Sequence, residues 1–411
     1  MFVWPRWLTP ALFALATPAL AQSAPGHDQA IGQQFHITAE SLPAPGATPS
    51  TLAPPKYIER GTNMPIVPEG FSVQIFVEGL TGPRRLEVGY DGVVYVAQQS
   101  RGGIIALYDR DGDGAADNGA GVIQGASNPF GLDTFRNGPS SGDMLLGEQD
   151  GVYLIPLNTG GSARPLTAPG VFGDAIGHIT REVAIDPRTR DVYVGVGSMA
   201  NLEEGEPAMK ATIQKFDETG QKQETFATGM RNVTGLAFND KTGDLYAVTM
   251  ERDDMGDELV PDYFTRVEKG DNFGWPYQYV GGNVQPEFSD KGLKLAAAKV
   301  PDVLFEAHSA PLDVIFVPDS WPEKYRGGAI VALHGSANAA TPRGYKLVFM
   351  PFKDGRPDGT YENFMTGFWV SGISPAEVWG RPCSLALDRD GSLLVGDDLG
   401  GSIWRVSPPK P

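Results

Sequence analysis

The chain has 411 residues, of which 41% are hydrophobic, and a formal net charge of −17. This acidity argues against nucleic acid as a partner, because phosphate groups need a basic surface. Cys383 is the single cysteine, which excludes an intramolecular disulfide, a C-x-x-C-H haem attachment and a thiolate metal cluster. Redox chemistry would therefore need a cofactor that is not covalently attached.

The N-terminal sequence predicts export. Residues 1–21 contain Arg6, an apolar run too short and too proline-interrupted for a membrane span, and the small-x-small sequence Ala19-Leu20-Ala21. We interpret residues 1–21 as a cleaved signal peptide for a bacterial periplasm, with no transmembrane segment left after cleavage. Residues 22–65 are rich in Pro, Ala, Ser and Thr and lack periodicity, which predicts a flexible segment.

Residues 66–411 repeat one pattern: a turn, an apolar strand, a turn with Asp, Asn or Gly, and a second apolar strand. The copies begin at Gly82, Asn128, His178, Arg231, Ala310 and Gly380. Six strand–turn–strand units with a period of roughly fifty residues are typical of a β-propeller. We predict one all-β domain, a six-bladed β-propeller of four-stranded antiparallel blades, with an outermost or closing strand in the C-terminal sequence SIWRVS.

In a propeller, the first turns of the blades meet at one mouth of the central channel. The side chains at this repeat position are His178, Arg231 with Asn232, His308, and Arg381. An imidazole that titrates near neutrality suits proton abstraction, and guanidinium groups suit an anionic ligand. Each residue also has a structural interpretation: a capping or core histidine, a surface arginine paired with an acid, or an asparagine that forms a turn.

The sequence DRDGDGAAD, residues 109–117, has the carboxylate spacing of an EF-hand loop at its first, third, fifth and ninth positions. The twelfth position is Ala120, where an EF-hand has a glutamate, and no flanking helices are evident. A solvated hairpin tip is the preferred interpretation, and a weak calcium site is the alternative.

Residues 226–277, from FATGMRNVTGLAF to GDNFGWPY, resemble the core of the glucose/sorbosone dehydrogenase family. Its members are six-bladed propellers that depend on pyrroloquinoline quinone (PQQ). The segments beginning at Gly177, His334 and Gly380 also resemble family segments, so the similarity covers essentially residues 66–408. The L-sorbosone dehydrogenase-like subgroup is the most similar.

The resemblance assigns roles to particular residues. It implies that His178 is the catalytic base and that Arg231 and Asn232 bind the quinone carbonyls. His308 falls on the wall of the cofactor site and Arg381 on a carboxylate-binding position. The resemblance also implies that backbone carbonyls near Arg252 and Asp253 hold the calcium ion (Ca2+) that clamps PQQ.

One segment departs from the family pattern. Members of the subgroup commonly read His-Gly-Ser-Trp-Asn-Arg, whereas this chain reads His-Gly-Ser-Ala-Asn-Ala over residues 334–339. An aromatic side chain and a cation are thus missing from the expected rim of the cofactor site. Arg343 or Lys346, slightly downstream, could replace the cation.

The function implied by the resemblance is a PQQ-dependent dehydrogenase that oxidises an aldose, or a sorbosone-like aldehyde, to a lactone or acid. Electrons would pass from PQQ to an external acceptor, a cytochrome c or a quinone-linked carrier. Two alternatives remain open. A calcium-dependent lactonase would need carboxylate and Asn side chains as metal ligands in the channel, and a cofactor-free binding propeller would explain the missing rim side chains.

Overall fold

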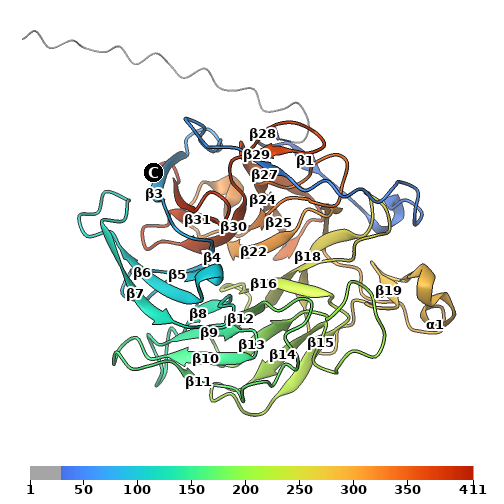
Figure 1. Cartoon of the computed structure of the whole chain (residues 1–411), viewed down its shortest axis with the longest axis horizontal. Coiled ribbons are helices and arrows are strands. Elements are labelled where there is room, and N and C mark those ends of the chain that lie inside the picture. The colour runs from blue at the N-terminus through green and yellow to red at the C-terminus, as the bar shows by residue number, and fades with distance from the viewer. Residues whose placement is uncertain (1–28, 411) are drawn as a thin grey trace, which may run out of the picture.

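The computed structural model describes residues 29–410, most of whose regular structure is antiparallel β-sheet. The main sheets follow one another around a common centre as the chain proceeds (Figure 1). Their innermost strands contact one another in a closed ring, in the order β4, β8, β12, β16, β22, β30 and back to β4. The predicted six-bladed β-propeller is confirmed.

The strands of the blades, given from the innermost outwards, have the following bounds. Blade 1 is β4 (Pro83–Val88), β5 (Val94–Gln98), β6 (Gly103–Tyr108) and β7 (Asn118–Gln124), and blade 2 is β8 (Leu132–Thr134), β9 (Met144–Glu148), β10 (Gly151–Ile155) and β11 (Arg164–Pro165). Blade 3 is β12 (Arg181–Ile185), β13 (Val192–Val196), β14 (Thr212–Phe216) and β15 (Glu224–Thr228), and blade 4 is β16 (Asn232–Phe238), β17 (Leu245–Met250), β18 (Pro261–Val267) and β21 (Val303–Ala307). Blade 5 is β22 (Pro311–Phe316), β23 (Ala329–Leu333), β24 (Lys346–Met350), β27 (Tyr361–Met365) and β1 (Gln34–Phe35), and blade 6 is β30 (Pro382–Leu387), β31 (Leu393–Asp397), β32 (Ser402–Ser407) and β3 (Ser72–Val77).

Smaller elements decorate the blades. A three-stranded sheet joins β2 (Lys56–Tyr57), β29 (Glu377–Val378) and β28 (Trp369–Ser371), and two hairpins pair β19 (Gln278–Tyr279) with β20 (Asn283–Val284) and β25 (Phe352–Lys353) with β26 (Arg356–Pro357). The helical turns are α1 (Ser289–Gly292), η1 (Ala39–Ser41), η2 (Gln99–Arg101), η3 (Pro286–Phe288) and η4 (Glu323–Tyr325). Across residues 29–410, no helix has the length and apolar character needed to cross a membrane.

The N-terminal part of the chain closes the propeller. The C-terminal sequence SIWRVS forms β32, which is the third strand of blade 6, and the outermost strand is β3, which pairs antiparallel with it. The C-terminal sequence is therefore not the outermost strand, but it does lie in the blade that closes the ring, which is the other position that the sequence predicted. One blade thus combines strands from both ends of the chain, which ties the ring together without a covalent link.

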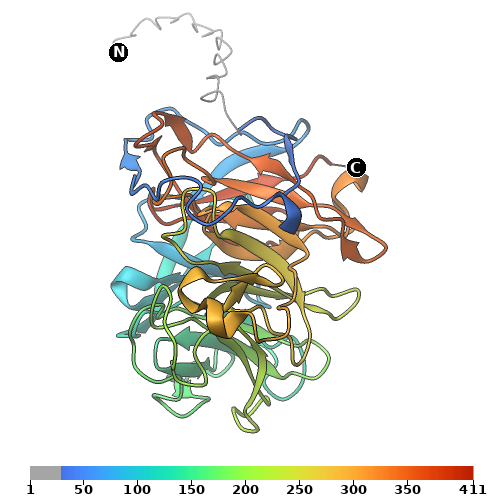
Figure 2. The same cartoon turned by 90° about the vertical axis from the view of Figure 1, so that its right-hand side faces the viewer.

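Residues 29–65 also lie on the propeller, where the sequence predicted a flexible segment. β1 pairs with β27 of blade 5, and β2 pairs with β29 (Figure 2). The composition of the segment suggested flexibility because the segment is too short and polar to form a core of its own. It is ordered instead by backbone hydrogen bonds to the blades. Residues 22–28 of the predicted segment, like the predicted signal peptide, lie outside the described residues.

Turn chemistry explains why the blade strands form where they do. In blade 4, the Asn239 side chain accepts hydrogen bonds from the backbone N–H groups of Lys241 and Thr242, and Gly243 has a φ of 72°. These are the local bonds and the left-handed conformation that reverse a chain between two strands. The apolar strand β17 that follows is buried on both faces, as expected between neighbouring blades.

A cluster of buried charges fills the centre of the channel. Arg85 of β4 forms ion pairs with Glu182 of β12 and Asp313 of β22, and all three side chains are buried. Arg85 bridges both carboxylates, and burial raises the pKa of Glu182 and of Asp313, which favours their neutral forms and limits the charge held in the interior. The first residues of the innermost strands lie at one end of this cluster, and their last residues line a cavity of about 760 Å³ at the other.

The loop over residues 109–117 has its predicted carboxylates close together. Ligand atoms of Asp109, Asp111 and Asp117 lie within 4.8 Å of one another, and all three residues are exposed. Oxygens of Asp109 accept hydrogen bonds from the N–H groups of Gly112 and Gly114. These bonds are those of a hairpin tip, which is the interpretation preferred from the sequence.

Candidate active site

His178 lies in the turn that leads into blade 3. Its backbone N–H donates to the Ser198 carbonyl at 3.0 Å, and its carbonyl accepts a hydrogen bond from Arg181 at 2.8 Å. Arg181 is fully buried at the start of β12, and its hydrogen bond to the His178 carbonyl holds the turn in place. An added Cβ at Gly197 would lie 2.5 Å from Cβ of His178 and 2.6 Å from Oδ1 of Asn232, so this close approach requires glycine.

The hydrogen bonds of His178 define its tautomer. Nδ1 lies 3.0 Å from the Ser198 carbonyl oxygen, which can only accept, so Nδ1 carries the proton. Within residues 29–410, Nε2 has no hydrogen-bond partner. Neutral His178 therefore presents an unprotonated nitrogen.

The charge state of His178 differs from the sequence-based expectation. Burial, followed by the positive charge of Arg231, lowers the pKa of His178 to about 4. The expectation of a group that titrates near neutrality is wrong for the protein without ligands. At neutral pH the imidazole is neutral and able to accept a proton.

Arg231 precedes β16 and is 4% exposed. Its guanidinium donates to the backbone carbonyl of Asn201 at 3.1 Å, the side-chain oxygen of Asn201 at 2.9 Å and the carbonyl of Glu251 at 2.8 Å. The same Asn201 side-chain oxygen accepts from the N–H of Asp253 at 2.9 Å. Arg231 thus holds two loops of the site together and is already engaged within the chain.

Asn232 has a polar atom without a partner. Its side-chain oxygen is buried and accepts no hydrogen bond within the described residues, and its amide nitrogen lies 3.8 Å from the Met250 sulfur. Such an orphaned polar atom is costly in a closed interior. It marks a place where a ligand could complete the site.

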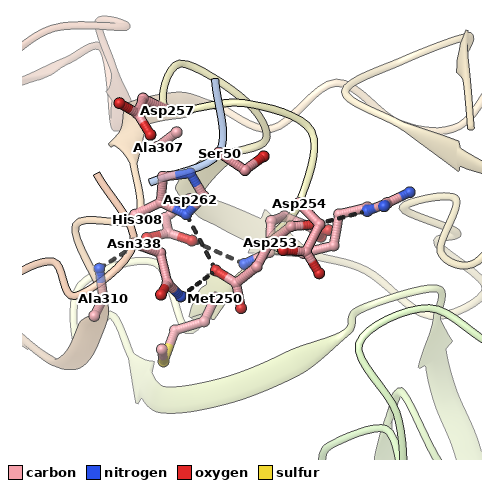
Figure 3. Close-up of polar contacts among 12 residues, drawn as sticks. Ser50, Met250, Asp253, Asp254, Asp257, Asp262, Ala307, His308, Ala310 and Asn338 are labelled. Atoms are coloured by element: carbon pink, nitrogen blue, oxygen red, sulfur yellow. Dashed lines mark hydrogen bonds and ion pairs between the residues drawn. The ribbon is translucent and has the colours of Figure 1, made fainter. Parts of the chain in front are cut away.

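Asp253 and His308 form the second half of the site, as Figure 3 shows. Asp253 Oδ1 lies 3.2 Å from Nδ1 of His308 and accepts a hydrogen bond from Asn338 at 2.8 Å. Nε2 of His308 lies 3.1 Å from the Gly256 carbonyl. Both ring nitrogens face acceptors, so the bonds favour the doubly protonated imidazolium.

The pKa values of this pair agree with that assignment. Burial lowers the pKa of His308, but the bonds to Asp253 and Gly256 outweigh it and raise the pKa above its usual value. Burial raises the pKa of Asp253, but the hydrogen bond from His308 and the positive charge of Arg231 outweigh burial and lower the pKa below its usual value. His308 therefore supports the loop around Asp253 rather than offering a free ring nitrogen to a ligand.

The predicted calcium ligands fit only in part. The guanidinium of Arg252 donates to Gln285 and forms an ion pair with Glu287, and no hydrogen bond to the Arg252 carbonyl is found within residues 29–410. The Asp253 carbonyl accepts from Arg252 Nε at 3.0 Å and from the Asn201 amide at 3.3 Å. A cation at the Asp253 carbonyl would have to displace at least one of these donors.

A second cluster joins blades 5, 6 and 1. His334 Nε2 donates to Asp398 at 2.8 Å, and Asp398 forms an ion pair with Arg84. Burial, with the charge of Arg381, lowers the pKa of His334 to about 4. Arg381 itself donates to the carbonyls of His334 at 3.0 Å and Gly335 at 2.6 Å.

This cluster keeps cationic groups available. Within the described residues, Nη1 of Arg381 and Nη2 of Arg84 have no hydrogen-bond partner, and the buried Nε of Arg84 is also unpaired. Arg84 is paired with Asp398, whereas Arg381 forms no ion pair within the described residues, so the Arg381 guanidinium favours an anionic ligand.

The downstream cations are placed differently from the expectation. The guanidinium of Arg343 donates to the Asp257 carbonyl at 2.6 Å and pairs with Glu258. Lys346 is fully buried, with its ammonium 4.3 Å from the ring centre of Phe35. The prediction that Arg343 binds the cofactor does not fit this placement, since its guanidinium is engaged by the loop at Asp257 and Glu258.

Four further residues belong to the site although the sequence interpretation missed them: Arg84, Asn201, Asn338 and Asp398. Arg84 lies in the first copy of the repeat, at the start of β4, so its repeat position carried a usable signal. Asp398 directly follows β31, whereas Asn201 and Asn338 lie in loops with no periodic pattern. Only the folded structure brings these loops to Asp253.

Comparison with known proteins places the chain in a family. The TrAA12-like family model matches residues 65–264 and 264–409. The chain belongs to the TrAA12-like family. This match over nearly the whole described chain supports the family-level resemblance to PQQ-dependent sugar dehydrogenases.

Individual relatives are distant. The PQQ-dependent pyranose dehydrogenase of Coprinopsis cinerea is 25% identical over 415 residues, which cover 84% of this chain and 55% of that protein. The chain therefore spans about half the length of this relative. The holo form of its PQQ domain superposes with a TM-score of 0.69 at 20% identity, covering 87% of this chain and 100% of that domain. A calcium structure of the Trichoderma reesei AA12 protein gives 0.67 at 19% identity, covering 90% of this chain and 100% of that one.

Proposed function

We propose that this member of the family is a PQQ-dependent oxidoreductase that oxidises an aldose, or a sorbosone-like aldehyde, to a lactone or acid. The observation that carries the proposal is His178, a neutral imidazole whose Nε2 has no hydrogen-bond partner within residues 29–410 and whose ring lies close to the positive charge of Arg231. The family match and the relatives named above support the redox chemistry. A cytochrome c or a quinone-linked carrier would accept the electrons.

The residues of the site suit PQQ, which is a planar anion with three carboxylates and two quinone carbonyls. Arg84 and Arg381 would bind carboxylates. Asn232 would bind a carbonyl through its amide nitrogen, whose only partner among residues 29–410 is the Met250 sulfur. Calcium would be held chiefly by the Arg252 carbonyl, since the Asp253 carbonyl already accepts two hydrogen bonds. PQQ, when bound, supplies a two-electron oxidant.

The remaining chemistry belongs to the chain. A sugar hydroxyl within hydrogen-bond distance of His178 Nε2 would give up its proton to that nitrogen as the C–H bond breaks. Nδ1–H stays on the Ser198 carbonyl, so the imidazolium that forms keeps its orientation. The positive charge of Arg231 opposes that protonation, and an anionic ligand nearby would relieve the opposition.

The lactonase alternative is less well supported. A lactonase metal would need free carboxylate and amide oxygens, whereas Asp253 Oδ1 accepts bonds from His308 and Asn338 and its other oxygen lies 3.8 Å from Arg231. The structure offers no comparable observation in favour of a binding propeller without a cofactor.

Titration calorimetry with PQQ tests the cofactor proposal. We expect PQQ to bind in the presence of calcium and to bind at least about tenfold more weakly after chelation, which corresponds to about 1.4 kcal/mol. Equal PQQ affinity with and without calcium would contradict the proposal that calcium helps to hold PQQ, but it would leave the proposal that PQQ is the cofactor intact. No binding in either condition would contradict the proposed function.

We also propose export to the periplasm, on the basis of the Ala19-Leu20-Ala21 sequence. Mass spectrometry of the native protein should find a mature N-terminus near Gln22 in a periplasmic extract. An intact Met1, or a protein confined to the cytoplasm, would contradict this localisation.

A further inference from the structure

Residues 46–53, here called the N-terminal strap, lie against the loop that carries Asp253. Within this loop, the N–H of Asp257 donates to the Pro49 carbonyl at 2.9 Å, and the N–H of Gly256 donates to the Ser50 hydroxyl at 3.0 Å. At the start of the strap, Gly46 donates to the Met255 carbonyl at 2.9 Å. The strap thus satisfies successive backbone groups of a loop that has no strand pairing of its own.

Asp257 joins three segments. Its buried carboxylate accepts the N–H of Thr51 in the strap at 2.9 Å and the N–H of Ala340 at 3.0 Å. Ala53 of the strap also donates to the Ala337 carbonyl at 2.8 Å. The strap therefore holds the very segment in which the aromatic side chain and the cation of the family pattern are absent.

The contact between strap and loop leaves no spare room. Gly256 has a φ of 108°, and an added Cβ would lie 2.6 Å from the Thr48 carbonyl oxygen. On the other side of Gly256, its carbonyl faces Nε2 of His308, whose Nδ1 faces Asp253. A continuous chain of contacts thus leads from the strap to the candidate site.

We propose that the N-terminal strap, through Asp257, positions the Asp253 loop and the segment at residues 336–340, and so sets the affinity of the site for its anionic cofactor. Asp257 is a positioning residue, because it acts through the backbone of Thr51 and Ala340. The loop would otherwise have to be ordered at the moment of binding, and that entropy would reduce affinity. The proposal rests on the proposed function.

The test compares Asp257→Asn with Asp290→Asn, a carboxylate of similar chemistry in α1. Asparagine keeps the size of the side chain, but its NH2 group cannot accept the second N–H. We expect the PQQ dissociation constant of Asp257→Asn to rise about tenfold, with turnover at saturating PQQ within about twofold of the original protein. Asp290→Asn should change neither quantity.

A second readout needs no cofactor. Lys56 follows the strap and its side chain is 61% exposed, so trypsin should cleave after it several-fold faster once the strap detaches in Asp257→Asn. Ser50→Ala removes the hydroxyl that accepts the Gly256 N–H, so it should also speed cleavage after Lys56. This variant replaces Asp257→Asn in the test if Asp257→Asn does not fold. The two substitutions should be less than additive together, because both release one strap.

The outcomes separate the two proposals. Unchanged PQQ affinity and unchanged cleavage in both variants would overturn the role of the strap while leaving the function. Faster cleavage with unchanged PQQ affinity would show that the strap detaches without affecting the site, and this result would also overturn the proposed role of the strap. If the original protein binds no PQQ at all, the proposed function fails and the cofactor-positioning role fails with it.

Discussion

Replacing His178 with glutamine should lower turnover by about two to four orders of magnitude, the usual contribution of a positioned general base. Glutamine can still donate to the Ser198 carbonyl, but it offers no basic nitrogen in place of Nε2. PQQ affinity and the melting temperature should change little. His36→Gln, at an exposed histidine outside the site, is the matched control and should leave all three quantities unchanged.

The pH profile of kcat/KM gives an independent check of the same residue. The pKa of His178 lies at about 4, below the usual value of 6.5, so the active neutral form prevails above that pH. We expect an ascending limb below pH 6, a plateau above it, and loss of the limb in His178→Gln. A variant that melts early yet turns over normally per folded molecule would assign His178 a structural role, and the base would have to be sought elsewhere.

Arg231→Lys should lower stability and PQQ affinity together. Lysine has a single donating group, which cannot reach both oxygens of Asn201 and the Glu251 carbonyl at once. Carbonyl and amide acceptors would lose their partners, so we expect a loss of about 1–3 kcal/mol in the free energy of unfolding. PQQ affinity should fall at least about tenfold, because the loops at Asn201 and Asp253 lose their common support.

Arg190→Lys is the control for this substitution, since Arg190 and Glu218 form an ion pair at the surface in which both side chains are partly exposed. Exposed ion pairs contribute little, so its melting temperature and affinity should be nearly unchanged. Denaturant unfolding and calorimetry of the same preparations measure both quantities. Full stability in Arg231→Lys would contradict the role of this guanidinium in holding the two loops.

The blades and their number could be predicted because each repeats local turn chemistry and strands that are apolar on both faces. The same repeat correctly places His178, Arg231, Asn232 and Arg381 at the starts of the innermost strands or immediately before them. These features depend on short-range sequence, as the turn at Asn239 shows.

What could not be predicted depends on pairing between distant parts of the chain. The closing strand β3 and the strap at residues 46–53 gain their structure from blades that follow them in sequence. The engagement of His308 and Arg343 by the loop around Asp257 likewise follows from contacts across blades. Residue type alone could not distinguish a cation that binds a ligand from one that supports a loop.

The most direct measurement of the central proposal is reconstitution of the purified protein with PQQ and calcium, followed by aldoses or aldehydes and an artificial redox dye. We predict bleaching of the dye that depends on both PQQ and substrate and that is abolished in His178→Gln. Bleaching absent for every sugar and aldehyde tried, with PQQ shown to be bound, would contradict an oxidoreductase of this class. Calcium-dependent lactone hydrolysis in the same preparation, without PQQ, would favour the lactonase instead.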